Sequence, residues 1–223
     1  MLCLDITHAW KGTEYRLSLR QAERALRKAA LLGAMVLVVI GIEIEGAEAG
    51  GPPYGPPYAY GDCDKATIGV GTADCAVDNY SGKVGVRATA FWGASAAQAQ
   101  VGTAGNFNQS GYYVIWCDIN YVAKFSKTSL AIATLHANLF ADGVKYTDDF
   151  LGADPVWPWQ LPSIWDLWSA PRNRSHWIVR KVFLGQGPHT IHCGLEARIA
   201  GSWNQSGGIV AVGDVTRINW SSW

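Results

Sequence analysis

Apolar and polar residues alternate with a period of two along much of the chain from about residue 83 onward. That period places every second side chain on one face of a β-strand. The run from His189 to Ile199 is the clearest case. Its apolar positions are Ile191, Cys193, Leu195, Ala197 and Ile199, and its polar positions are Thr190, His192, Glu196 and Arg198. One apolar face is typical of an antiparallel sheet that covers a core.

Similar patterns predict further strands at residues 83–90, 115–121, 129–139, 209–212 and 215–220. After residue 49 we expect no long helix, only one short turn over Ser163 to Trp168. Short strands separated by Gly, Asn and Asp turns indicate an all-β fold. The sequence therefore predicts an antiparallel β-sandwich or jelly-roll-like domain over residues 63–223.

Residues 1–49 have the composition of a signal peptide that is removed. A basic stretch precedes the apolar run from Ala29 to Ile42, and Ala47-Glu48-Ala49 has small residues where a signal peptidase cleaves. The apolar run is shorter than the roughly 20 residues that span a bilayer, so we expect no membrane anchor after processing. Two alternatives stay open. In the first, the apolar run is retained as a membrane anchor. In the second, Arg27-Lys28-Ala29 is a cleavage region like that of type IV pilins, and the apolar helix after it is retained.

Export makes the cysteines informative. Cys3 leaves with the leader, and the mature chain keeps Cys63, Cys75, Cys117 and Cys193. An even number in an oxidising compartment predicts two disulfides, with three possible pairings. We expect a local Cys63–Cys75 bridge across a short Gly/Asp-rich loop, which leaves Cys117 and Cys193 to join distant strands. The alternative for the second pair is two free buried thiols.

Two segments depart from the strand pattern. Residues 50–62 carry two Pro-Pro-Tyr units, and proline fixes φ and removes backbone donors, so we expect an extended arm there. The segment Gly105 to Gly111 recurs as Gly201 to Gly207, with an Asn-Gln-Ser in each copy. Each copy lies between two strand-like runs, and we expect each to be a hairpin loop.

Charge and motifs exclude several function classes. The formal net charge is zero and 16% of residues are charged, which gives no electrostatic basis for binding nucleic acid. His189 and His192 would point to opposite faces of a strand, and His136 lies mid-strand. We find no nucleophile elbow, P-loop or Cys-x-x-Cys. We expect no catalytic site, metal or cofactor; a carboxylate pair of glycosidase type, distant in sequence, is the alternative.

N-glycosylation sequons are more frequent than chance predicts. They begin at Asn79, Asn108, Asn173, Asn204 and Asn219. Two lie in the repeated loop, where an acceptor would be exposed, whereas Asn219 falls in a terminal strand. We expect covalent N-glycans.

Tryptophans gather between Val156 and Trp177. They are Trp157, Trp159, Trp165, Trp168 and Trp177. Exposed indoles stack on sugar rings, so the first four are candidate glycan contacts. The alternative is a long connection that folds its indoles over one end of the domain, because large apolar groups seldom stay in water.

These features predict a secreted structural protein, located outside the cell or at its surface. The arm, or the segment Ala66 to Gly71, would pair with the sheet edge of a neighbouring copy and build a homopolymeric filament. In layout alone (signal peptide, short arm, glycosylated β domain) the chain resembles archaeal extracellular pilins and threads that assemble by donor-strand complementation. No motif matches residue by residue. The alternative is a secreted carbohydrate-binding module that uses the Trp-rich loop.

Overall fold

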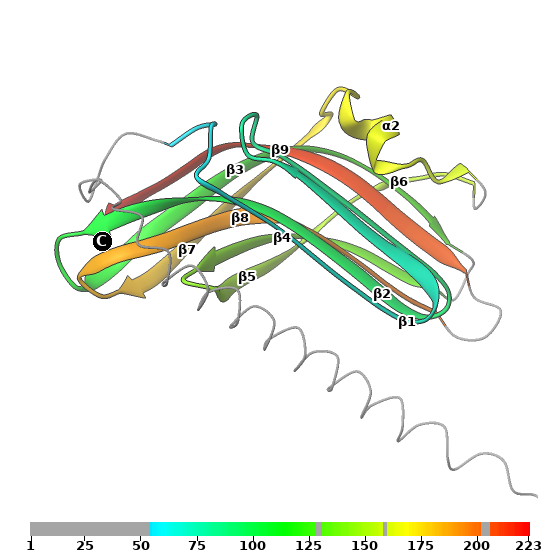
Figure 1. Cartoon of the computed structure of the whole chain (residues 1–223), viewed down its shortest axis with the longest axis horizontal. Helices are drawn as coiled ribbons and strands as arrows, with labels where there is room; N and C mark the ends of the chain where they lie inside the picture. The colour runs from blue at the N-terminus through cyan, green and yellow to red at the C-terminus, as the bar shows by residue number, and fades with distance from the viewer. Residues whose placement is uncertain (1–53, 128–130, 158–159, 202–205) are drawn as a thin grey trace, which may run out of the picture. The chain divides into compact units, whose positions relative to one another are not determined.

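The structure, a computed structural model, describes residues 54–127, 131–157, 160–201 and 206–223 (Figure 1). The predicted leader and Trp159 lie outside these ranges. The elements are β1 (Tyr60–Asp78), β2 (Lys83–Phe107), β3 (Gly111–Lys127), β4 (Ile132–Ala141), β5 (Val144–Leu151), β6 (Asp154–Pro155), α2 (Ile164–Trp168), β7 (Arg174–Leu184), β8 (Gly187–Gly201) and β9 (Gly207–Ser222). The predicted short turn before Trp168 is α2.

All strands in the described ranges belong to one nine-stranded sheet with the order β5-β4-β8-β2-β9-β3-β6, in which β1 also pairs with β2 and β7 with β3. Every pairing is antiparallel except that between β3 and β6, which is parallel. The prediction of an all-β, mostly antiparallel domain is therefore confirmed. The strands form a single curled sheet (Figure 1).

The long strand β2 belongs to both halves of this sheet. Residues 83–90 pair with β9, whereas residues 93–107 pair with β8. We call β8, β4, β5 and the second part of β2 the β8 half, and β9, β3, β7 and the first part of β2 the β9 half. The two halves face each other across the core.

The curl begins at a sharp bend in the ribbon of β1 and β2. Cys63 and Cys75 are twelve residues apart in β1, a distance of roughly 40 Å in a straight strand. Their Cα atoms are 5.7 Å apart, so β1 doubles back between them. Gly69 and Gly93 face each other at the bend with φ angles of 85° and 102°. Residues other than glycine rarely adopt these angles, which is why the bend lies here.

Apolar residues from both halves fill the space between them. The predicted apolar faces of β3 (Ile115, Cys117, Ile119, Tyr121) and of β8 (Ile191, Cys193, Leu195, Ala197, Ile199) are buried. A disulfide joins Cys117 in the β9 half to Cys193 in the β8 half. The structure thus contains the two cysteine pairs that the sequence predicts, and each one links facing parts of the sheet.

The repeated segment differs from the prediction. The first copy connects β2 to β3, and these strands are not paired with each other. In the second copy, of which residues 202–205 lie outside the described ranges, β8 is followed by β9 in the opposite half. Neither connection is a hairpin. The local pattern predicted a break between strands, which the first copy has at residues 108–110, but whether the flanking strands pair depends on the curl of the whole sheet.

The described part of the predicted arm packs on the domain. Tyr54 forms an isolated bridge with Ile218 and stacks on Trp220 at 5.0 Å between ring centroids. Tyr58 is only 5% exposed, and its hydroxyl donates to the carbonyl oxygen of Val215 at 3.2 Å. The strand β1 already begins at Tyr60. From residue 54 onward, this segment is thus part of the domain and does not extend from it.

Candidate functional site

The outward face of the edge strand β7 is apolar. Ile178, Val182 and Leu184 point into the core, as expected of a strand that covers it. The alternate positions that point to solvent would ordinarily be polar. Here they include Trp177 and Phe183, which are 69% and 57% exposed, and Val179 between them.

Neighbouring strands extend this surface. The ring of Tyr112 on β3 meets Phe183 edge-on at 5.4 Å between centroids. The Lys181 Nζ lies 4.7 Å from the centroid of the Tyr112 ring and 3.9 Å from that of Trp223. We call the exposed apolar residues of this surface the aromatic face; they are Tyr112, Trp177, Val179, Phe183 and Trp223.

The other end strand of the sheet, β5, is also apolar toward solvent. Val144, Tyr146 and Phe150 are exposed, and Phe150 is 68% exposed. Among the described residues β5 pairs only with β4, and β7 only with β3. Both strands therefore present an unpaired backbone edge on the same side of the domain, which we call the β5/β7 side (Figure 1).

Side chains, not backbone pairing, hold β5 and β7 together. The Asp149 carboxylate on β5 binds the His176 Nε2 at 3.1 Å and the Arg180 guanidinium, both on β7. Arg180 also donates to the Thr147 hydroxyl at 2.7 Å. Burial raises the pKa of Asp149, but the hydrogen bonds from Thr147 and His176 and the charge of Arg180 outweigh it and lower the pKa overall. The carboxylate is thus ionised and ties the two edges together.

A second ionic cluster lies on the outer surface of the β8 half. Glu196 is buried beneath its partners and accepts hydrogen bonds from Lys145 at 2.7 Å, Asn138 at 2.7 Å and Arg198. Arg198 also binds both carboxylate oxygens of Asp148, at 2.9 and 3.0 Å. Burial raises the pKa of Glu196, but the Arg198 hydrogen bonds and the Lys145 charge lower it by more, so the pKa lies below the ordinary value for Glu.

We expect Glu196→Gln to lower the free energy of unfolding by about 2 kcal/mol at pH 7, because Arg198 and Lys145 lose a charged partner. A depressed folded-state pKa contributes stability above the ordinary pKa of Glu, about 4.3, and this contribution is lost as the pH falls through the folded-state value. Urea denaturation at pH 7 and at lower pH measures both. The difference between variant and wild type should shrink on acidification; a difference independent of pH would contradict the assignment.

The Trp-rich segment mainly covers the β9 half. Ser163 caps α2, since its hydroxyl accepts from the Asp166 amide at 3.2 Å while the Asp166 carboxylate accepts from the Ser163 amide at 2.7 Å. Ile164 and Leu167 pack with Val210 and Val212 in a small second core, against which Trp168 also lies. The residues of α2 thus cover part of the β9 half, as the alternative of a connection folded over the domain predicts.

Of the four candidate glycan contacts, Trp157, Trp165 and Trp168 lie within the described residues, and their role in glycan binding stays a prediction. Trp157 and Trp165 are each 65% exposed, and Trp165 lies 5.4 Å from Trp168 with its ring tilted by 51°. Trp177, which the sequence grouped with them, belongs to β7.

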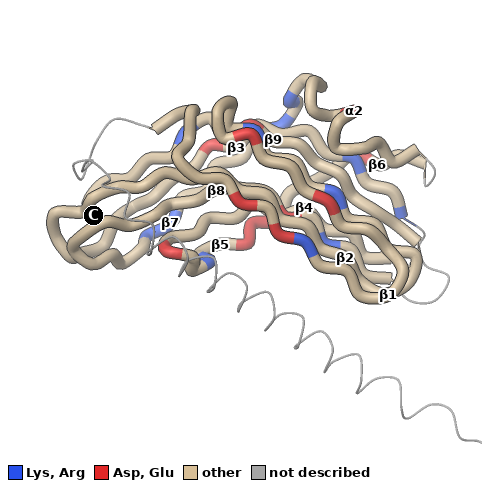
Figure 2. The backbone as a smooth tube through the Cα atoms, viewed as in Figure 1, with Lys and Arg blue, Asp and Glu red and all other residues tan. Residues whose placement is uncertain are grey.

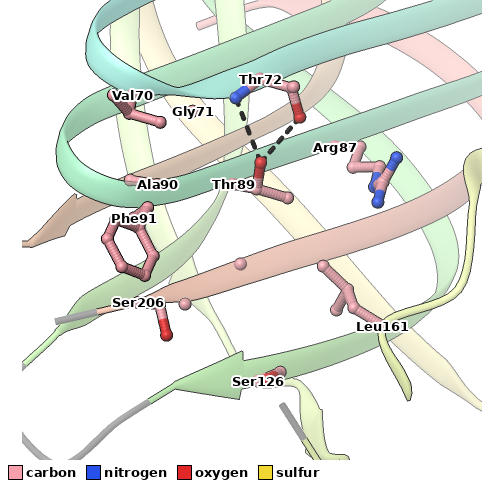
Figure 3. A pocket seen from close by; sticks show the side chains of 12 residues that line it. Val70, Gly71, Thr72, Arg87, Thr89, Ala90, Phe91, Ser126, Leu161 and Ser206 are labelled. Carbon is pink, nitrogen blue, oxygen red and sulfur yellow. Dashed lines mark hydrogen bonds between the residues drawn. The ribbon is translucent and has the colours of Figure 1, made fainter. Parts of the chain in front are cut away.

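An open groove of about 440 Å³ lies between the bend of the β1–β2 ribbon and Leu161 (Figure 3). The Thr72 and Thr89 hydroxyls face each other there at 2.7 Å. Arg87 and the exposed ring of Phe91 complete a mixed polar and apolar lining. Trp157, Trp165 and Trp168 are not among the described residues that line this groove, which is a separate candidate site for a small polar ligand.

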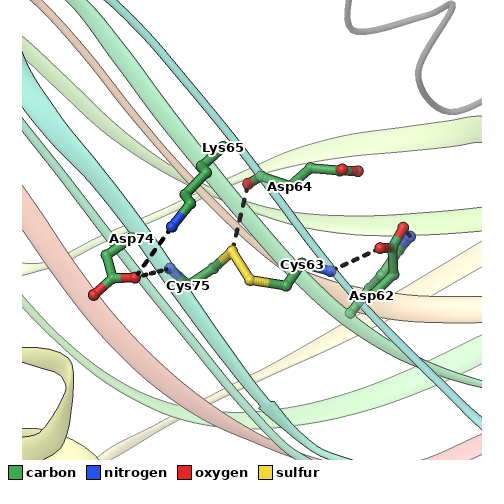
Figure 4. The surroundings of a disulfide bond; sticks show 7 residues. Asp62, Cys63, Asp64, Lys65, Asp74 and Cys75 are labelled. Carbon is green, nitrogen blue, oxygen red and sulfur yellow. Dashed lines mark hydrogen bonds and ion pairs between the residues drawn. A yellow bond between two sulfur atoms is a disulfide. The ribbon is translucent and has the colours of Figure 1, made fainter.

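The part of β1 around the Cys63–Cys75 disulfide is polar. Around the Cys63–Cys75 disulfide lie Asp62, Asp64, Lys65 and Asp74, and Lys65 is 3.9 Å from Asp74 (Figure 4). Burial, followed by the negative charge of Asp62, raises the pKa of Asp64. Basic and acidic residues are interspersed along the strands elsewhere (Figure 2). Exposed apolar side chains also occur at the bend of the ribbon, where Ile68 and Val70 on β1 and Phe91 on β2 are exposed. The exposed apolar residues of β5 and β7 therefore contrast with the disulfide region of β1, not with the whole strand.

The sequon asparagines differ in exposure. Asn108 and Asn173 are exposed beside strand ends, whereas Asn79 is half-buried in the turn after β1. Asn219 is half-buried within β9, and its Oδ1 accepts from the Trp220 amide at 2.8 Å. Asn204 lies outside the described ranges. Glycosylation at all five stays a prediction.

Within the described ranges, no three His, Cys, Asp or Glu side chains are grouped to hold a metal ion. No helix in those ranges is long and apolar enough to cross a membrane. The two disulfides indicate a compartment other than the cytoplasm.

No family model and no curated protein matches this chain. Solved structures with a distant likeness include a Paenibacillus sp. cycloisomaltooligosaccharide glucanotransferase, with a TM-score of 0.26 and 17% identity over 78% of this chain and 19% of that chain. Another is the enzymatically active domain of bacteriophage CBA120 tailspike protein 4, with a TM-score of 0.31 and 10% identity over 74% of this chain and 20% of that chain. This chain thus spans about a fifth of their length.

Sequence reasoning missed the aromatic face. Its signal is the run from Arg174 to Leu184, in which apolar residues occupy core positions such as Ile178 and outward positions such as Val179. When both faces are apolar, period-two alternation disappears, and the strand is recognised only once its neighbours are known.

Proposed function

We propose that this chain is an extracellular structural protein that assembles with copies of itself through the β5/β7 side. The observation that carries the proposal is the coincidence of two unpaired strand edges with exposed Trp177, Phe183 and Phe150 on the same side. An open edge is a template for another strand, and a large apolar patch on an isolated domain is unfavourable in water. Association between copies would pair the open strand edge and remove the apolar patch from water.

The structural role accords with the rest of the chain. In this proposal the two facing halves of the curled sheet take the place of the two sheets of the predicted sandwich. The disulfides link facing parts of the sheet, and the sheet is open at one side. The segment Ala66 to Gly71, first considered as a donor strand, is paired with β2 of its own chain. The proposal therefore assigns the contact to β5 and β7, and it includes no catalytic step, cofactor or nucleic acid. The product is a filament or surface layer, with N-glycans on exposed loops.

Paired substitutions test the proposal. In Trp177→Ser/Phe183→Ser, loss of two exposed aromatic anchors should raise the dissociation constant of the assembly roughly a hundredfold, since each such anchor contributes about 1–2 kcal/mol. The matched control is Trp165→Ser/Phe91→Ser, which removes a similarly exposed Trp and Phe elsewhere. Sedimentation velocity of the mature protein measures both. The proposal fails if the wild type is a monomer at all concentrations, or if both variants weaken association equally.

A second candidate function is carbohydrate binding at the groove near the β1–β2 bend. The observation in its favour is the exposed Phe91 ring beside the Thr72, Thr89 and Arg87 polar groups. Aromatic rings stack on sugars while such groups bind hydroxyls. The control variant above then tests this alternative, because Phe91→Ser would abolish retention on insoluble polysaccharide while Trp177→Ser/Phe183→Ser would not.

A further inference from the structure

The free edge of β7 is complementary to itself. We propose that β7 pairs antiparallel with β7 of a second copy, about a twofold axis at Val179. The inference rests on the proposed function and names the contact by which two copies meet. It follows from the order of residues along β7, from Arg174 to Leu184.

Pairing about Val179 uses the whole strand. Because Val179 is its middle residue, the ends Arg174 and Leu184 lie opposite each other and no residue is left without a partner. In this register every basic side chain faces an apolar one: Arg174 faces Leu184, His176 faces Val182, Arg180 faces Ile178 and Lys181 faces Trp177.

Several other antiparallel registers bring like charges together, and an axis at Val182, which does not, pairs only residues 180–184. An axis at Arg180 places two guanidinium groups directly opposite each other, and an axis at Lys181 does the same with two ammonium groups. An axis at Trp177 places Arg174 opposite Arg180. Like charges directly opposite destabilise a strand pair. A parallel arrangement also aligns each basic residue with its equivalent in the other strand. The Val179 register is therefore favoured by charge.

The Lys181 side chain gives this register a specific contact. Its Nζ already lies over the rings of Tyr112 and Trp223. Pairing adds Trp177 of the second copy across the strand, and tryptophan is the aromatic residue that binds a cation best. By symmetry the contact occurs twice.

The charges on the inner face of β7 do not oppose the pairing. Inward-pointing charges on an edge strand usually discourage association. Here the Asp149 carboxylate of the same chain binds both His176 and Arg180, so these two side chains are directed toward β5 and away from an incoming strand. The paired sheets continue through β3, β7, the second β7 and the second β3, and the two aromatic faces become one surface.

Such a contact is isologous and closes on itself. It makes a dimer, and a filament then grows through a second contact that covers the joined aromatic faces. The dimer is the repeating unit that this inference adds to the proposed function.

Cysteine substitution tests the register. In Val179→Cys the two new thiols lie opposite each other, and opposite Cα atoms in an antiparallel pair are about 4.5–5.5 Å apart, within the range of a disulfide. Oxidation by copper phenanthroline should convert most of the mature protein to a covalent dimer, with two electrons passing to the oxidant and two protons released. Thr216→Cys, exposed on β9, is the control and should stay monomeric on a non-reducing gel.

A mixed experiment checks the same axis at another point. Ser175→Cys and Phe183→Cys should each fail to cross-link alone, because each faces the other residue, and should cross-link when mixed. Peptide mass mapping identifies the linked residues. A thiol titration first shows that the cysteine of Val179→Cys is free to react. If this variant then fails to cross-link although Trp177→Ser/Phe183→Ser disrupts the assembly, the register is wrong and the proposed function stands. If the wild type is monomeric, both are wrong.

Discussion

Gly93→Ala is expected to lower the free energy of unfolding by about 4 kcal/mol or more, which is exceptional for one added methyl group. Gly93 has a φ angle of 102°, and a Cβ there would lie 2.0 Å from the carbonyl oxygen of Ile68. Because the obstacle is backbone, it cannot rotate away. Either the bend opens or the strand pairing at Ile68 breaks. Urea denaturation followed by circular dichroism measures the loss.

Two other glycines separate the causes of this effect. Gly187 also has a positive φ, 124°, but a Cβ there would meet nothing within 4 Å. Gly187→Ala should therefore cost only about 1 kcal/mol of backbone strain. Gly111 has neither feature, and Gly111→Ala should be nearly neutral. If Gly93→Ala were no worse than Gly187→Ala, the close approach at the bend would be refuted.

Removal of the disulfide between the two halves should have the second large effect. Cys117→Ala/Cys193→Ala opens a link across 76 residues of sequence, for which the chain-entropy relation gives about 4 kcal/mol. Both side chains are fully buried, so the small cavities left by alanine add to the loss. Thermal or urea unfolding of the oxidised protein measures the change.

The local bridge provides the comparison. Cys63 and Cys75 are separated by 12 residues, and the same relation gives about 3 kcal/mol for that loop. Because Cys63 is exposed, its replacement leaves no cavity. Cys63→Ala/Cys75→Ala should therefore destabilise the domain less than the buried pair. A larger loss at Cys63 and Cys75 would contradict the order derived from loop length and burial.

Local pattern predicted the strands whose environment is one-sided. In β3 and β8, one face meets the core and the other meets polar side chains, so alternation alone identifies the buried residues, Cys117 and Cys193 among them. The cysteine count then restricted the pairings. The short helix was predictable because Ser163 and Asp166 form a capping box by themselves.

Features that depend on the whole sheet were not predictable in this way. The sequence predicted a short loop between Cys63 and Cys75, whereas both cysteines belong to the long strand β1, which doubles back at Gly69. The strand β7 has apolar residues on both faces, so its period is hidden. Residues 105–111 predicted a turn, but the curl of the sheet decides that β2 and β3 lie in different halves.

The candidate site was hidden for the same reason. Trp177 was grouped with the tryptophans that precede it in sequence, whereas the fold groups it with Tyr112, Phe183 and Trp223. Which exposed side chains lie together at a sheet edge depends on which strands are edge strands. The order of strands in the sheet decides this, and composition does not reveal it.

Electron microscopy of the native protein, taken from the cell surface or the medium, tests the central claim most directly. The account predicts regular assemblies in which neighbouring domains meet through β5 and β7, with Trp177 and Phe183 buried in the contact. Dispersed single particles, or assemblies in which the β5/β7 side faces solvent, would contradict it.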